Sequence, residues 1–573
     1  MPLHLRRRSA PVAAAALVLL WTLAWVPSAT AIVGDRTGIN VIAPIGRSIT
    51  GTIKGADTNA AIAHAVVSAY SSDFSSYGSA SVNASGVFLI RGLKPSLQYV
   101  VTISPSDGIH YGGCYTSANA NHFLHNCPYP QPMTTALTTS PLNIGIIKVP
   151  KGFTISGTVK GGTTTSNVAL VGVDVSVNGT TAGSGYGSAS SGAGGAWSVT
   201  ALPPGTYHVS YSTPSTMNYR DGQWKSNGGT NWINSVGVPG DIVITTANKA
   251  ANVILPTGFT VQGYVKNTAG TAGLAGAGVG LECQTPTTGC VGDDESAVTD
   301  ATGHYIMRGA PAGTYRLSVE PKSLTNYQTG YYTTTAGVTS HFKNAPDAGS
   351  SFAVSAAKTL LDVRLPAGFR VTGTVERISP STVGVQGAFV AVSGSGAVAN
   401  SGYASTAANG TFTVVGLNPG TYTVQVLAPS TMDAFGGYFD AVLTPSKLNL
   451  NASAADTKAL SAGVPTWAIG VVHLRQGYKL SGTISGGTVA SHVAINGAFV
   501  IASKTVAPYF TAFATTTSTG AYSMQGLPAG DYRVSYSVPS SSPYRPGYYK
   551  SGAGGGTNWV ETSLSAGTVH VGP

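Results

Sequence analysis

Apolar and polar residues alternate along most of the chain, and the same alternating stretch returns at a regular interval. Phe153, Ile155 and Val159 form one such stretch, and Phe369 and Val371 begin another. Alternation with a period of two is typical of a β-strand that buries one face. The pattern therefore predicts a chain built from strands that each cover a core on one side.

A glycine opens each of these stretches and sets the length of the repeat. The opening glycines recur at a nearly constant interval along the chain, at Gly46, Gly152, Gly258, Gly368 and Gly477. This spacing divides the chain into five repeats after a lead-in at 32–45. The predicted repeats cover 46–150, 151–256, 257–366, 367–475 and 476–573.

A ten-residue unit is the most regular part of every repeat. A turn glycine comes first, an aromatic residue follows two positions later, and a second turn follows after ten residues. The first turns lie at Gly86, Gly195, Gly303, Gly410 and Gly520, and the second turns at Ser96, Gly205, Gly313, Gly420 and Gly530. A constant spacing is expected where tight turns fix the register of a hairpin.

About seven short strands in each repeat favour an all-β fold of five tandem seven-stranded Greek-key β-sandwich domains. The linkers, such as Pro150-Lys151 and Pro256-Thr257, are two or three residues long. Short linkers that contain proline leave little freedom, so we expect an extended, stiff array.

Pro573 follows Trp559 much more closely than Pro256 follows Trp232. The fifth repeat is therefore expected to lack its final strand.

The repeated motifs resemble those of the carboxypeptidase regulatory-like domain family. The motif strings are Gly-x-Val-x-Gly-x-Val, then Gly-Ala-x-Val, then Thr-Asp-x-x-Gly-x-Tyr and Leu-x-Pro-Gly-x-Tyr-x-Val, and the clearest matches lie at 298–305 and 527–532. The family consists of transthyretin-like (prealbumin-like) sandwiches related to the Cna-B-type repeats of bacterial adhesins. The resemblance covers 45–573 and implies the fold, whereas a shared sandwich does not determine a function.

Composition and charge indicate where the protein is located relative to the cell. Residues 1–31 read as a signal peptide, because three arginines precede an apolar run and Ala29-Thr30-Ala31 forms a cleavage site. Its removal takes three arginines and no acids, so the net charge falls from +10 to +7. No further apolar run of spanning length and no basic cluster follows, so we expect a secreted protein without a membrane span or a nucleic-acid partner.

Four cysteines lie in two close pairs, Cys114 with Cys127 and Cys283 with Cys290. An even number in an exported chain favours local disulfide bonds. Histidines near the first pair leave a metal site as an alternative, but tight Cys-x-x-Cys or His-x-x-x-His spacing is missing.

The acidic run at 293–295 is interpreted as a hairpin tip, with a calcium loop as the alternative. We therefore predict no metal and no cofactor.

The sequence offers no catalytic constellation. Acids do not recur at equivalent strand positions, and no Gly-x-Ser-x-Gly motif lies on a strand-to-helix turn. We therefore predict that the chain is not an enzyme.

An aromatic pair follows the ten-residue unit in every repeat. Repeats two and five add a near-identical Gly-Thr-Asn-Trp loop, and the residues concerned are Tyr219, Trp224, Asn231, Trp232, Tyr544, Tyr549, Asn558 and Trp559. Such rings could stack on sugars while the amides bind hydroxyl groups, and this makes them candidate ligand-binding residues. The alternative is that they close the end of each sandwich as part of its core.

These observations predict a secreted scaffold for binding, adhesion or spacing, whose partner would be an extracellular glycan or a surface protein. A carbohydrate-binding module array, directed at starch or another glycan, is the first alternative. An accessory part of a glycosidase or peptidase is the second.

Overall fold

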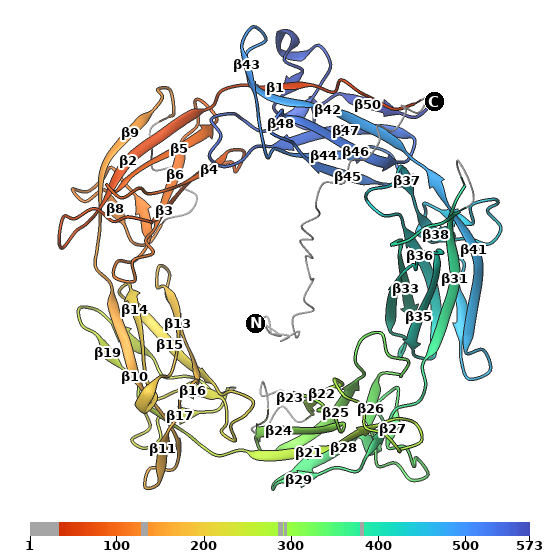
Figure 1. Cartoon of the computed structure of the whole chain (residues 1–573). Coiled ribbons are helices and arrows are strands. Elements are labelled where there is room, and N and C mark those ends of the chain that lie inside the picture. The colour runs from red at the N-terminus through yellow and green to blue at the C-terminus, as the bar shows by residue number, and fades with distance from the viewer. Residues whose placement is uncertain are drawn as a thin grey trace.

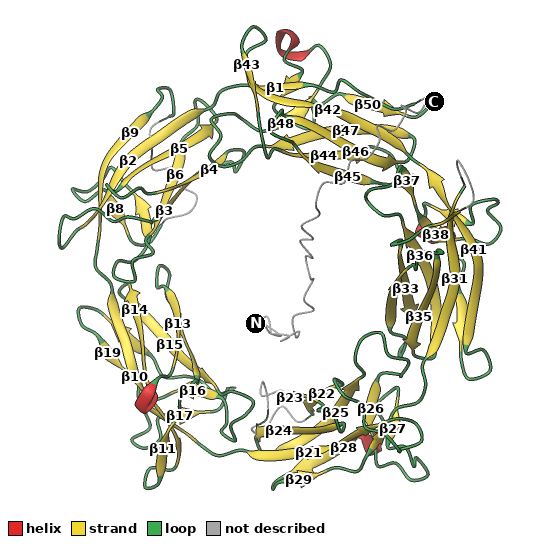
Figure 2. Ribbon diagram, viewed as in Figure 1, coloured by secondary structure: helices red, strands yellow, loops and turns green. Residues whose placement is uncertain are grey.

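A computed structural model describes residues 34–573 except 128–133, 135, 236, 285–289, 291–294 and 379–382. The predicted signal peptide and the acids Asp293 and Asp294 lie outside these residues. Within the described part, strands dominate, and the helical segments are 3-10 turns of three or four residues, such as Ala193–Gly195. The predicted all-β class is confirmed (Figure 2). No helix in the described part is long and apolar enough to cross a membrane.

The first sheet of each sandwich is built around the strand that opens the repeat. In the second sandwich, β10 (Phe153–Gly162) pairs antiparallel with β14 (Ala196–Leu202) and parallel with β20 (Val253–Leu255). The opening strands of the other repeats are β2 (Arg47–Gly55), β21 (Phe259–Lys266), β31 (Phe369–Arg377) and β42 (Tyr478–Gly487). The last strand of the second sandwich thus returns beside its first strand.

The second sheet carries the hairpins that the regular ten-residue unit predicts. In the second sandwich, β12 (Asp174–Gly179) lies between β13 (Tyr186–Ser190) and β15 (Gly205–Ser212). Short strands from the aromatic tail, β16 (Gly222–Trp224) and β17 (Trp232–Ile233), extend this sheet. These added pairings take the strand number of the sandwich above the seven predicted.

A buried tyrosine fixes the turn between the two sheets in every repeat. The Tyr207 hydroxyl donates a hydrogen bond to the Pro203 carbonyl oxygen at 2.6 Å. The equivalent bonds join Tyr315 to Pro311, Tyr422 to Asn418, Tyr532 to Pro528 and Tyr99 to Lys94. Each of these rings is fully buried. The constant spacing seen in the sequence therefore reflects a side chain that bonds back to its own turn.

Among the described residues, buried hydrophobic side chains form five separate clusters, and four of them draw on one repeat each. The fifth cluster is different, because Ile39, Val41 and Ala43 from the lead-in pack with residues of the last repeat. These lead-in residues include β1 (Val41–Ala43), which pairs parallel with β42. The lead-in is therefore part of the fifth sandwich.

β1 occupies the place of the strand that the fifth repeat was expected to lack. Ser485 of β42 pairs with Ile42, just as Lys160 of β10 pairs with Ile254. The last strand of the chain, β50 (Thr568–Val571), instead pairs with β47 (Gly530–Ser537), as β18 (Ile242–Ile244) does with β15. The edge of β42 is thus filled from the other end of the chain.

This pairing corrects the expected extended shape. The sandwiches follow one another in a tandem array, but the array closes into a ring, with β1 and β42 meeting where the two ends of the described chain come together (Figure 1). In each sandwich the first sheet lies on the outer side, and the second sheet lies toward the centre of the ring (Figure 1). Short linkers do restrict movement, but they fix a bend of the same sense at each junction, and five such bends close.

Candidate functional site

The junctions between neighbouring sandwiches share one hydrogen-bonding pattern. The opening glycine of each repeat donates its backbone N–H to a carbonyl in the tail of the preceding sandwich. The pairs are Gly152 to Ile109, Gly258 to Asn218, Gly368 to Asn326, Gly477 to Asp433 and Gly46 to Pro543, at 2.8–3.0 Å. The last of these pairs joins the fifth repeat to the first, so the closing junction is built like the other four.

The Gly-Thr-Asn-Trp loops hold the final strand in two of the sandwiches. In repeat two, the Asn231 side chain donates to the Asn252 carbonyl at 3.3 Å, and the Thr230 carbonyl accepts from the Ile254 N–H at 2.8 Å. In repeat five, Asn558 donates to the Asn40 carbonyl at 3.0 Å, and Thr557 accepts from Ile42 at 2.9 Å. The near-identical loops therefore bind near-identical strands, one supplied by the same repeat and one by the opposite end of the chain.

The bound strands also carry a shared sequence that the motif analysis missed. Asn252-Val253-Ile254 and Asn40-Val41-Ile42 are the same tripeptide. In each tripeptide, the side-chain oxygen of the asparagine accepts a hydrogen bond from the backbone N–H of a threonine on the opening strand. The threonine is Thr158 in repeat two and Thr483 in repeat five, and both distances are 2.9 Å. A comparison of the lead-in with the repeat ends could have identified the closing strand.

The two tryptophans of these loops have matching environments. Trp232 Nε1 donates to the Asp221 carbonyl at 3.3 Å, and the Arg220 guanidinium lies 4.7 Å from the ring centroid. Trp559 Nε1 donates to the Pro546 carbonyl at 3.3 Å, and Arg545 lies 4.8 Å from its ring. Both rings are half-buried and pack against the core of their sandwich.

The other predicted ligand-binding residues also lie at the sandwich ends. Tyr219 and Trp224 are half-buried against the second core, and Tyr544 is half-buried against the fifth. Tyr549 is only 8% exposed. Tyr219 and Tyr544 also form the backbone bridges to the next linker, with Thr257 and Ile45. The structure thus brings each set of four together, but places them in packing and junction contacts.

An ion pair crosses the closing junction. Glu561 of the fifth repeat lies 2.7 Å from the Lys94 Nζ of the first repeat and 2.6 Å from the guanidinium of Arg545. Partial burial by itself would raise the pKa of the Glu561 carboxyl, but the hydrogen bond from Lys94 and the charge of Arg545 outweigh it and lower the pKa. The carboxylate is therefore stabilised in its charged form where the first and fifth sandwiches meet.

Both predicted disulfides are present. Cys114 bonds to Cys127 and Cys283 to Cys290, each with a Cα–Cα distance of 5.8 Å. The histidines near the first pair have other contacts: His110 Nδ1 lies 2.6 Å from Asp107 Oδ2, and the His125 ring packs edge-on against Tyr111. Among the described residues no group of three His, Cys, Asp or Glu side chains is placed to hold a metal ion.

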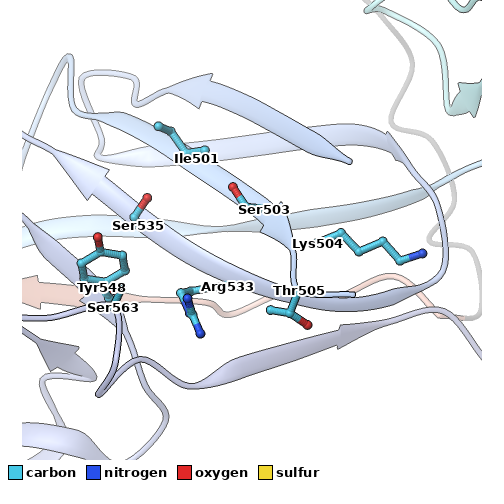
Figure 3. Close-up of a pocket in the computed structure, with 8 residues that line it drawn as sticks. All are labelled: Ile501, Ser503, Lys504, Thr505, Arg533, Ser535, Tyr548 and Ser563. Carbon is cyan, nitrogen blue, oxygen red and sulfur yellow. The ribbon is translucent and has the colours of Figure 1, made fainter. Parts of the chain in front are cut away.

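A further pocket, which motif analysis did not identify, lies on the second sheet of the fifth sandwich. Its volume is about 390 Å³, and its lining comes from β44 (Phe499–Lys504) and the loop that follows it, from β47 and β48 (Gly547–Tyr549), and from the loop before β50. The lining residues are Ile501, Ser503, Lys504, Thr505, Arg533, Ser535, Tyr548 and Ser563 (Figure 3). They come from segments that are well separated along the chain, and no local motif links them.

Comparisons with known proteins assign the chain to no family. Neither a protein-family model nor a curated protein matches the chain, so the resemblance to the carboxypeptidase regulatory-like family is not confirmed. Solved structures with some likeness include a streptococcal ancillary pilin, with 12% identity over 57% of this chain and 99% of that chain and a TM-score of 0.21.

Two other solved structures have similar scores. The TIE protein of Bacillus anthracis has 13% identity over 72% of this chain and 69% of that chain, with a TM-score of 0.16. The shaft pilin SpaA of Lactobacillus rhamnosus GG has 13% identity over 38% and 98%, with a TM-score of 0.19. Scores of this size assign no function to the chain.

Proposed function

We propose that the protein is a non-catalytic, ring-shaped scaffold that works outside the cell and presents binding surfaces on the sheets facing its centre. The pairing of β1 with β42 carries this proposal. It connects the two ends of the described chain, so the sandwiches are held in one fixed arrangement rather than on a flexible string. The aromatic tails are proposed as structural parts of this ring.

Three further features support a rigid extracellular role. Backbone hydrogen bonds at five equivalent junctions restrict rotation between neighbours. A closed ring also covers the strand edge that an open fifth sandwich would expose, and exposed edges promote aggregation. Two disulfides favour an oxidising compartment, since such bonds persist mainly outside the cytosol.

Imaging tests the ring directly. Electron microscopy of the chain from residue 32 to 573 should give closed rings with five lobes, and solution scattering should fit the same outline. A chain that begins at Gly46 should give open arcs. Elongated particles from the longer chain would contradict the proposal.

Export is tested separately. When the chain is produced with residues 1–31 in a secreting host, mass spectrometry should find a secreted product that begins at Ile32 with no free thiols. Retention of the full-length chain inside the cell would contradict an extracellular role.

A further inference from the structure

The face of the fifth sandwich that lies toward the centre of the ring carries two rows of aligned side chains. Ile501 pairs with Ser535, and Ser535 pairs with Tyr548 on the next strand. In the neighbouring row, Ser503 pairs with Arg533. Paired residues on adjacent strands point to the same side of a sheet. The two rows therefore form one continuous surface of hydroxyl groups, an aromatic ring and a guanidinium group.

Arg533 supplies the guanidinium group of this surface. Its Nε atom is buried and has no hydrogen-bond partner among the described residues. Among the ion pairs of the described residues, none involves the Arg533 guanidinium. Asp531, the next residue on this face of β47, lies 2.8 Å from His570 Nδ1 instead. A buried donor without a partner is costly, and a guanidinium fork matches the geometry of a carboxylate.

Lys504 is the other cation that lines the pocket. Its ammonium group points away from the other labelled side chains (Figure 3). The guanidinium of Arg533 is therefore the positive group that a ligand in the pocket would meet.

The third sandwich has the same trio of arginine, serine and tyrosine and provides an internal comparison. Arg316 lies on β25 (Gly313–Glu320) with its guanidinium 5.8 Å from the Tyr331 ring. The residue opposite Arg316 is Glu282, whereas the residue opposite Arg533 is Ser503. The Nε of Arg316 is likewise buried without a hydrogen-bond partner in the described part of the chain, so the two positions differ in the residue opposite the arginine, which is an acid in the third sandwich and a serine in the fifth.

We propose that the pocket around Arg533 binds a carboxylated saccharide, with the guanidinium holding the carboxylate. The inference rests on the ring scaffold of the proposed function, because it assigns a ligand to one of the faces that this scaffold presents. The hydroxyl groups of Ser503, Ser535 and Ser563 can exchange hydrogen bonds with sugar hydroxyls, because each can donate and accept. The Tyr548 ring offers an apolar face with a polar edge, which suits a pyranose ring. The volume of about 390 Å³ lies in the range of small-ligand sites.

Neighbouring aromatic residues extend the surface beyond the pocket. Phe513 of β45 (Thr511–Thr515) pairs with Ile501 and is 69% exposed. It therefore lies in the same row as Ser535 and Tyr548, two strands from Ser535. A saccharide of more than one unit could contact this ring while its carboxylate remains on Arg533.

The test uses the whole chain from residue 32 and pairs of ligands that differ only in charge. Isothermal titration is carried out with oligomers of galacturonate, glucuronate and mannuronate, with a sialylated oligosaccharide, and with the methyl ester of each. At least one acid should bind, and its ester should bind at least ten-fold more weakly. No binding by any of these acids, or equal binding of acid and ester, would overturn the proposal. Binding of inorganic phosphate or sulfate without a saccharide preference would also overturn it.

Variants locate the site within the ring. Arg533→Gln should weaken binding of the acid by ten-fold or more, since it removes a charge-assisted pair. Ser503→Glu should do the same by reproducing the arrangement of the third sandwich. Arg316→Gln serves as the matched control and should leave the affinity unchanged. Unchanged affinity in both fifth-sandwich variants, or equal loss in the control, would place the ligand elsewhere.

A gain-of-function variant keeps the test independent of any loss of folding. Glu282→Ser removes the carboxylate opposite Arg316 and should raise the number of bound saccharides per ring from one to two. A stoichiometry that stays at one would show that an arginine opposite serine on this face is not sufficient, and would overturn the role given to the guanidinium. Ring closure is measured on the same samples by electron microscopy, so failure of saccharide binding is distinguishable from failure of the ring.

Discussion

Ala201 adopts a backbone conformation that its side chain disfavours. Its φ is 58°, in the left-handed region, whereas the equivalent positions of the other repeats are the glycines Gly92, Gly309, Gly416 and Gly526. A Cβ atom added at Gly309 would lie 2.5 Å from the Tyr219 carbonyl oxygen of the preceding sandwich. The position therefore combines a left-handed turn with a close approach between neighbouring sandwiches, and glycine suits both.

Ala201→Gly is expected to stabilise the second sandwich. Removal of the Cβ relieves the left-handed conformation, which costs about 1–2 kcal/mol for an L-residue, and part of this gain is offset by a more flexible unfolded chain. The free energy of unfolding should therefore rise by about 1 kcal/mol, measured by chemical denaturation. Gly309→Ala is the matched opposite change and should destabilise the third sandwich. A loss of stability in Ala201→Gly would show that the methyl group makes a packing contact that outweighs the strain.

Trp232 is expected to contribute to stability. Its ring packs against the second core, its Nε1 is hydrogen-bonded, and Arg220 lies over its face. Trp232→Ala should lower the free energy of unfolding by about 2–4 kcal/mol, somewhat less than for a fully buried tryptophan because the ring is partly exposed. Tyr186→Ala, at a side chain 87% exposed, is the control and should change little. A stable Trp232→Ala protein with weakened glycan binding would instead support the ligand-binding interpretation of the tails.

At the scale of elements, β1 is the strand on which the fifth sandwich depends. Val41 and Ala43 are fully buried, and the Ile39 carbonyl accepts the Tyr522 hydroxyl at 2.8 Å. Without β1, the side of β42 that it covers would be left as an open edge beside an incomplete core. The isolated repeat 476–573 should for this reason be the least stable of the five.

A chain that begins at Gly46 should therefore lose stability in one sandwich only. Loss of the buried lead-in side chains is expected to cost the fifth sandwich more than about 3 kcal/mol. Calorimetry should show one transition shifted down by about 10 °C or more, with the other transitions unchanged. A synthetic peptide of residues 34–45 should restore the shifted transition, and a scrambled peptide should not. An unchanged melting profile would mean that β1 adds little to the fifth core.

At the scale of the whole molecule, ring closure should depend on pH through Glu561. The folded-state pKa of this carboxyl lies below its ordinary value of 4.5, so its contribution to stability is present above that value. The contribution is lost as the pH falls through the lowered folded-state pKa. Protonation removes the charge that Lys94 and Arg545 share across the junction.

Hydrogen exchange can measure this effect on the strand that closes the ring. Protection of the amides at residues 36–43 should fall below about pH 4.5 in the wild type, in line with the ordinary glutamate pKa. Glu561→Gln should show lower protection near neutral pH and little further loss on acidification. Asp300→Asn, a turn variant in the third sandwich, should retain the wild-type profile. Equal acid sensitivity of Glu561→Gln and the wild type would assign the effect to other carboxyl groups.

The candidate sites were accessible from the sequence to different degrees. Cysteine spacing predicted both disulfides, because separations of seven and 13 positions close within one repeat. The aromatic tails lie at the sandwich ends, and whether they bind ligands or only pack stays a prediction. The Arg533 pocket was missed because its residues meet only through the pairing of β44, β47 and β48.

The sequence by itself determined the strands, the turns and the all-β class, because alternation and turn chemistry act over short stretches of chain. It also indicated that 476–573 fall one strand short of the other repeats. Only the tertiary structure decided what fills that edge, since Ile42 and Ser485 lie near opposite ends of the chain and no local pattern joins them. The bend at each junction is likewise set by contacts between neighbouring sandwiches. The short linkers alone suggested an extended array, whereas five such bends close the array into a ring.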